Sequence, residues 1–188
     1  MFTYTFKKIA LTSKVTVAEN GSPVMYAHQK IKFKENIIVY TDSSKTAQLG
    51  NLAADKVIDF SPTLTFRDAQ QIVRFSVKRH GRASIWKANY EIHDPQGGLL
   101  YKVNEVNPWA KVMDSLFGEI PVLGLFAGYV FHVKYDVTGA NGEPVAQIRK
   151  MPAFLEGKYE VEIGHTQDPL GILPTAVLAV LTRERSRS

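Results

Sequence analysis

Residues 170–181 have the sequence LGILPTAVLAVL, and this stretch decides the fold. Nine of its twelve positions are Leu, Ile, Val or Ala, and they surround every face of a helix instead of forming one stripe. A helix that is apolar on all sides belongs in a protein core or in a membrane. Twelve helical residues span about 18 Å, whereas a bilayer core of about 30 Å needs about 20 residues. We therefore predict a core helix that the rest of the chain encloses.

The residues on either side of this segment indicate where the helix ends. Asp168 and Pro169 suit a helix cap and a first helical position, although Pro174 also fits a helix start. Residues 183–188 contain three Arg and two Ser. We expect them to leave the core as a polar basic tail.

The remainder of the chain predicts strands joined by tight turns. Alternation of apolar and polar residues, interrupted by turn residues, is typical of β-hairpins. Two of the hairpins turn on Asn-Gly, at residues 20–21 and 141–142, and this pair accepts the positive φ angles of tight turns. The predicted hairpins are Lys14–Tyr26, Ile37–Leu49, Ala88–Val103 and Val133–Lys150, with further strands at 56–60, 72–78 and 158–163.

The hairpins resemble one another beyond their turns. Residues 20–24 and 141–145 share the pattern Asn-Gly-x-Pro-Val, and residues 90–92 and 135–137 share Tyr, an acid and an aliphatic residue. We interpret this as an internal repeat. The alternative is that turn chemistry offers few choices, so that unrelated hairpins look alike.

These patterns predict a mainly β (α+β) fold in one domain, residues 1–188. A chain of 188 residues is of the size for a single core. We predict a closed antiparallel barrel of about 12 strands around the C-terminal helix, since closure removes exposed sheet edges. A short amphipathic helix is predicted at residues 108–117, after the Asn-Pro pair at 107–108.

Composition limits the classes of function. The chain has no cysteine, which excludes disulfides, thiol nucleophiles and zinc–thiolate sites. Its N-terminus lacks the basic start and unbroken apolar run of a signal peptide, so we expect a cytoplasmic protein. The formal charge of +5 favours anionic partners, including a membrane surface at which the protein would be peripheral.

No residue pattern indicates a reaction. Phosphate-loop, dinucleotide-binding, nucleophile-elbow and zinc-protease motifs are missing. His93 beside Asp94 is explained by a turn, and Asp168 near His165 by a helix cap. Glu160 and Glu162 share one strand face, as expected of a solvated outer surface. We therefore predict no enzyme, catalytic residue, cofactor or metal.

The densest basic segment is the best candidate for binding. Residues 78–82 are Lys-Arg-His-Gly-Arg, and an aromatic residue follows at position 86. Several cations near an aromatic side chain suit a phosphate-rich headgroup at an interface, although a charged hairpin tip has the same composition. Lys30, Lys32 and Lys34 alternate along another strand and extend the candidate surface. The predicted headgroup-binding residues are Arg74, Lys78, Arg79, Arg82, Trp86 and Lys87.

Four segments resemble the tubby C-terminal-like fold, and within it the LURP-one-related family, with phospholipid scramblases as more distant relatives. They are ANYEIHDPQGGLLYKV (88–103), YDVTGANGEPVAQIRK (135–150), KYEVEI (158–163) and DPLGILPTAVLAVL (168–181). The resemblance spans nearly the whole chain, but it consists of strand and turn patterns without catalytic signatures. The proline-rich arm and cysteine cluster of scramblases are absent, which argues against scrambling.

The resemblance implies a non-enzymatic module that binds anionic phospholipid or phosphoinositide headgroups, or a protein partner, through basic surface loops. No site residue is carried over from the family. A small-molecule-binding barrel or an enzyme is the alternative, and it requires a barrel interior that the helix does not fill. Nucleic-acid binding is a third possibility, favoured by the basic charge.

Overall fold

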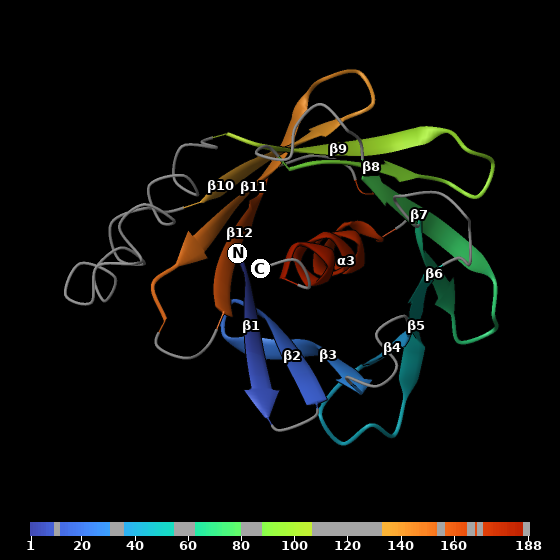
Figure 1. The fold of residues 1–188 in the computed structure, drawn as a ribbon, viewed down its shortest axis with the longest axis vertical. Coiled ribbons are helices and arrows are strands. Elements are labelled where there is room, and N and C mark those ends of the chain that lie inside the picture. The colour runs from blue at the N-terminus through green and yellow to red at the C-terminus, as the bar shows by residue number, and fades with distance from the viewer. Residues whose placement is uncertain are drawn as a thin grey trace.

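The computed structural model describes residues 1–9, 12–30, 36–54, 63–79, 88–106, 133–153, 157–164, 168 and 171–185. These residues form twelve strands and one helix (Figure 1). Each strand pairs antiparallel with its neighbours in the chain, and the first also pairs with the last. The predicted closed β-barrel with a C-terminal helix is confirmed. The elements are β1 (Phe2–Ile9), β2 (Thr12–Glu19), β3 (Ser22–Lys30), β4 (Asn36–Tyr40), β5 (Gln48–Ala54), β6 (Leu64–Asp68), β7 (Val73–Arg79), β8 (Asn89–His93), β9 (Leu99–Glu105), β10 (Lys134–Gly139), β11 (Pro144–Met151), β12 (Gly157–Ile163) and α3 (Leu173–Arg185).

The barrel has two distinct ends, because successive strands alternate in direction. The short turns after β2, β4, β6, β8 and β10 all lie at one end, which we call the turn end. The other end, where β1 ends and β2 begins, is the exit end. Helix α3 follows β12 at the turn end and runs through the barrel, so that its last residues lie at the exit end (Figure 1).

A β-bulge occurs at equivalent positions in five hairpins, which are β2–β3, β4–β5, β6–β7, β8–β9 and β10–β11. In each hairpin the register shifts near the turn, and the return strand holds one extra residue. In the first four hairpins the extra residue is at positions 24, 49, 74 and 100, at intervals of 25, 25 and 26 residues. The equivalent residue of the fifth hairpin is at position 145. This spacing supports the internal repeat inferred from the turns.

The β6–β7 turn and the β8–β9 turn have the same length and the same pattern of hydrogen bonds. The N–H of Asp68 donates to the carbonyl of Ile72 (3.0 Å), as the N–H of Asp94 donates to that of Gly98 (2.8 Å). Each Asp carboxylate also accepts two backbone N–H groups of its own turn, at 2.7 to 3.0 Å. The β6–β7 hairpin was not predicted from the sequence, because its turn contains no glycine.

Alternate side chains of the strands point inward and pack against α3. Residues 176–181 of the helix are each at most 1% exposed. Aromatic side chains fill part of the space between helix and wall, with Phe66 and Phe75 stacked at 5.2 Å and Phe6 in edge contact with Tyr159 at 5.7 Å. The helix therefore occupies the interior that its sequence predicted.

The observed helix is displaced along the chain from the predicted one. It begins at Leu173, beside the alternative start at Pro174 and not at residue 170, and Pro174 lies in its first turn, where proline is tolerated. Asp168 caps it, because its carboxylate accepts the N–H groups of Ile172 (3.2 Å) and Leu173 (2.8 Å). The Tyr101 hydroxyl donates to the same carboxylate (3.2 Å). Burial and this carboxylate raise the pKa of Tyr101 to about 12.

The predicted polar tail is wrong for residues 183–185, which form the last turn of α3. Glu184 is buried, at 7% exposure, because a side chain within the barrel provides its hydrogen bond. The predicted helix at 108–117 and the predicted strand at 56–60 lie outside the described residues. Within the described chain, no helix is both long and apolar enough to cross a bilayer.

We expect Leu178→Ala to destabilise the protein by about 2–5 kcal/mol, because truncating a fully buried leucine leaves a cavity. Urea unfolding measures the loss. Ile72→Ala, at a site 56% exposed, is the matched control and should change stability by less than about 0.5 kcal/mol. Equal effects of both substitutions would contradict the role of α3 as the core.

We expect Gln71→Gly to stabilise the protein by about 0.5–1 kcal/mol. Gln71 has φ +64°, a left-handed conformation in which a side chain costs about 1–2 kcal/mol, partly offset by the greater chain entropy of glycine. The reciprocal change, Gly97→Ala at φ +88°, should destabilise by a similar amount, since a Cβ there meets no atom within 4 Å and only backbone strain remains. Thermal unfolding of the two variants tests the pair.

Candidate functional site

Three of the six predicted headgroup-binding residues are described, and all three lie on β7, with Arg74 and Lys78 on its outer face. Arg74 lies on the outer surface, 3.8 Å from the Asp68 carboxylate. Lys78 is exposed on the outer face of β7, whereas Arg79 lies on the inner face with Phe75 and Val77. The separation follows from strand geometry, because consecutive side chains point to opposite faces. Arg82, Trp86, Lys87, Lys32 and Lys34 lie outside the described residues, as does the side chain of Lys30.

A buried polar cluster surrounds the end of α3 inside the barrel. The Tyr90 hydroxyl donates to the Glu184 carboxylate at 2.7 Å, and the N–H of Ala88 donates to the carboxylate of Glu105 at 3.0 Å. Burial, followed by the nearby Glu184 carboxylate, raises the pKa of Tyr135 above its ordinary value. The Tyr90–Glu184 bond joins α3 to β8, and the Ala88–Glu105 bond joins β9 to the residue before β8. We interpret them as an anchor of the helix.

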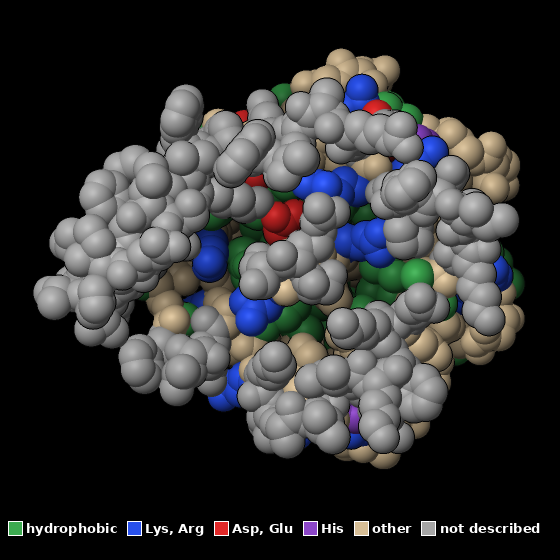
Figure 2. Space-filling model, in the orientation of Figure 1, with side chains coloured by type: hydrophobic (Ala, Val, Ile, Leu, Met, Phe, Trp, Pro, Cys, Tyr) green, Lys and Arg blue, Asp and Glu red, His purple; other side chains and the backbone are tan. Residues whose placement is uncertain are grey.

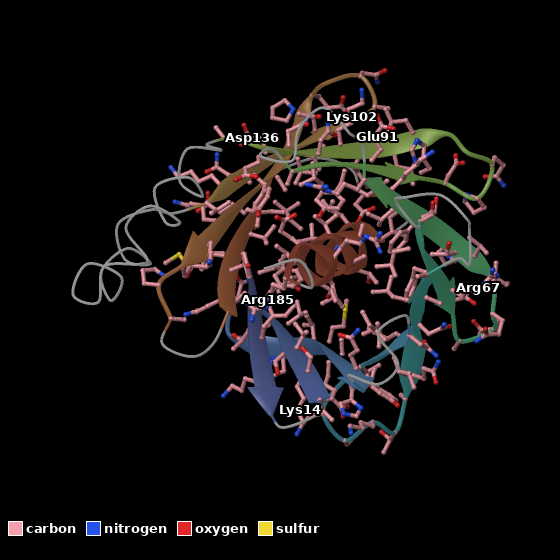
Figure 3. All side chains as sticks on the ribbon, in the orientation of Figure 1. Lys14, Arg67, Glu91, Lys102, Asp136 and Arg185 are labelled. Atoms are coloured by element: carbon pink, nitrogen blue, oxygen red, sulfur yellow. The ribbon has the colours of Figure 1, made fainter. Side chains whose placement is uncertain are left out.

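Arg185 anchors the same turn of α3 to the other side of the barrel. Its guanidinium lies 5.0 Å from the centre of the Phe6 ring, within range of a cation–π interaction. Gly157 provides the space, because a β-carbon there would overlap the guanidinium. Figure 3 shows Arg185 beside β1, and Figure 2 shows Lys and Arg side chains around the barrel axis at the exit end. From the sequence, Arg185 was expected in the polar tail and not in the helix.

The outer face of the barrel carries a different basic group, formed by four residues of β12, β1, β2 and β3. Lys7 lies directly opposite Lys14, and Lys14 lies directly opposite His28. Lys158 is diagonal to Lys7, since its partner on β1 is Thr5. We call these residues the basic wall: Lys7, Lys14, His28 and Lys158.

Described acidic side chains are few on β1 to β4, whereas β12 carries Glu160 and Glu162 on the same face as Lys158. Among the described residues of β1 to β4, Glu19 is the one acid, and it is the last residue of β2, at the turn end. Like charges directly opposite each other on neighbouring strands are destabilising. An anion bound between Lys7 and Lys14 would offset their mutual repulsion.

The opposite side of the barrel shows the usual compensation of charge. Glu91 lies 4.0 Å from Lys102 and 3.4 Å from the imidazole of His93. Arg149 on β11 forms an ion pair with Glu162 on β12, the strand that also carries Lys158 of the basic wall. Figure 3 shows Glu91 and Lys102 together on this side, whereas Lys14 points away from the helix on the far side of the barrel. The basic wall is thus a local feature and not a property of the whole surface.

The sequence pattern did not indicate the basic wall, because the residues of the wall are dispersed along the chain. Lys7 and Lys14 are in different strands, and Lys158 comes from the last strand, which reaches β1 only through barrel closure. The available signal was alternation, since Lys14 begins the predicted first hairpin and His28 continues the alternation two residues after its end. The pairing register was needed to place them opposite each other.

The sequence matches no protein-family model, and a search of curated proteins finds no significant relative.

We expect Tyr90→Phe to destabilise the protein by about 1.5–3 kcal/mol, because it removes a hydrogen bond to a buried carboxylate. Tyr40→Phe, on the outer face of β4, removes the same hydroxyl at a partly exposed position and serves as the control. Chemical unfolding of both variants measures the difference. A Tyr90→Phe effect no larger than that of Tyr40→Phe would contradict an anchoring role for the Tyr90–Glu184 bond.

Proposed function

We propose that this chain is a non-enzymatic module of the tubby-like kind that binds an anionic phospholipid surface through its basic wall. The observation that carries the proposal is the register of Lys7, Lys14 and His28, which places three basic side chains in one row. Neighbouring strands are about 4.8 Å apart, so the row brings its cations close enough together to act on one anionic surface.

The interior of the barrel favours a surface function over an internal one. A small-molecule-binding barrel needs space along its axis, whereas α3 lies there with residues 176–181 almost completely buried. The buried polar groups at the end of α3 bond to the barrel wall, as Tyr90 does to Glu184. This bond fixes the end of the helix to the wall, which supports binding at the outer surface.

Charge also differs between the two ends of the barrel. The carboxylates of Asp42, Asp68, Asp94 and Asp168 lie at the turn end, where they bond to backbone N–H groups. Lys7 and Lys14 lie in the half of their strands nearer the exit end. A negatively charged membrane would therefore attract the exit end and its adjoining wall and repel the turn end.

Each lysine near an anionic membrane contributes about 1 kcal/mol, so Lys7 and Lys14 together contribute about 30-fold in affinity. We expect Lys7→Glu/Lys14→Glu to lower binding to phosphatidylcholine vesicles containing phosphatidylserine by at least about 30-fold. Co-sedimentation measures binding, and raised salt should weaken it. The control is Lys102→Glu/Lys134→Glu, which makes the same change of net charge on the other side of the barrel.

Two outcomes would overturn the proposal. Equal losses in both double variants would mean that net charge, and not the basic wall, controls binding. Binding of wild-type protein to a single-stranded oligonucleotide in preference to vesicles would replace the phospholipid partner with nucleic acid. Circular dichroism of each variant separates lost binding from lost folding.

A further inference from the structure

Two turns of the barrel contain the same reactive dipeptide in different hydrogen-bonded settings. Asn20-Gly21 joins β2 to β3, and Asn141-Gly142 lies between β10 and β11. Both asparagines are exposed, and a β-carbon on either glycine would meet no atom within 4 Å. Each turn continues with one polar residue and then Pro-Val. Exposure and local sequence are therefore closely matched, whereas the hydrogen bonds around the two dipeptides differ.

An Asn-Gly pair can react within itself, because glycine has no side chain to hinder the approach of its nitrogen. The backbone nitrogen of the glycine loses its proton to solvent and attacks the Cγ atom of the asparagine side chain. The bond from Cγ to the side-chain nitrogen then breaks, and this nitrogen takes a proton from solvent and leaves as ammonia. Water opens the resulting succinimide ring at either carbonyl, which gives aspartate or isoaspartate.

We propose that Asn20 is a modification site of this protein, and that it deamidates faster than Asn141 in the folded chain. The Gly142 N–H donates to the carbonyl of Gly139 at 3.0 Å, and this bond must be lost before the Gly142 nitrogen can react. Among the described residues, none accepts a hydrogen bond from the Gly21 N–H. The attacking nitrogen is thus available in the first turn and engaged in the second.

The groups around the two asparagines favour the same site. The N-terminal amino group of Met1 donates to Oδ1 of Asn20 at 3.0 Å. This oxygen gains negative charge when Cγ is attacked, and a donor aimed at such an oxygen stabilises the transition state. In the second turn, the carboxylate of Glu143 accepts from the N–H of Asn141 at 3.2 Å. A negative charge at this position opposes both the deprotonation of Gly142 and the developing oxyanion.

The modification changes the charge and the backbone of the turn end. Aspartate at position 20 places a carboxylate beside the amino group of Met1, where it forms an ion pair. Isoaspartate also lengthens the main chain by one methylene between β2 and β3, the strands that carry Lys14 and His28 of the basic wall. The reaction needs no ligand, so it does not depend on the proposed phospholipid binding.

Peptide mass mapping after incubation of the folded protein at mildly alkaline pH measures both sites. Trypsin separates them into peptides 15–30 and 135–149. Because Gly142 must first give up a backbone hydrogen bond of about 1 kcal/mol, Asn20 should deamidate at least about fivefold faster than Asn141. Equal rates, a faster reaction at Asn141, or no reaction at Asn20 would overturn the inference.

Glu143→Ser is the matched variant, because it gives both turns the sequence Asn-Gly-Ser-Pro-Val. In urea its two sites should react at equal rates, whereas in the folded variant Asn20 should stay the faster site. Unequal rates in urea would mean that the folded turns are not the cause of the difference. Equal rates in the folded variant would overturn the role of the Gly142 hydrogen bond. Circular dichroism confirms that the variant is folded before urea is added.

Discussion

The packing of α3 inside the barrel is the constraint on which the rest of the structure depends. A twelve-strand barrel encloses a space that strand side chains alone do not fill, and an apolar helix without a surrounding wall would expose its surface to water. The helix thus fills the space inside the barrel, and the barrel covers the apolar surface of the helix. Closure between β1 and β12 follows, because an unclosed sheet would leave part of the helix uncovered.

The wall around the helix is assembled from one unit used repeatedly. Equivalent bulges in five hairpins increase the local twist and bend of the strands at the same level of the barrel, which helps a sheet to close. The turns vary more than the bulges. One has Asn20-Gly21, whereas the β6–β7 turn accepts a strained Gln71 and retains the same Asp-centred hydrogen bonds as its neighbour.

Because α3 fills the interior, the charged residues inside the barrel and those on its outer face have different roles. Glu184 and Arg185 are at the end of α3 but contact the wall, and they hold the helix in place. Lys7 and Lys14 lie directly opposite each other on the outer face of β1 and β2. This row of cations is the reason for seeking the function on the outer face of β1 to β3.

The sequence by itself determined the fold class, the interior position of the helix and most hairpins, because these depend on local periodicity and turn chemistry. It did not determine the end of α3, since Arg183, Glu184 and Arg185 are polar and become helical only where Tyr90 and Phe6 provide partners. It also grouped Lys78 with Arg79, whereas strand alternation places them on opposite faces. The basic wall was decided by tertiary structure alone. Lys7, Lys14, His28 and Lys158 meet only because register and barrel closure bring distant parts of the chain onto adjacent strands.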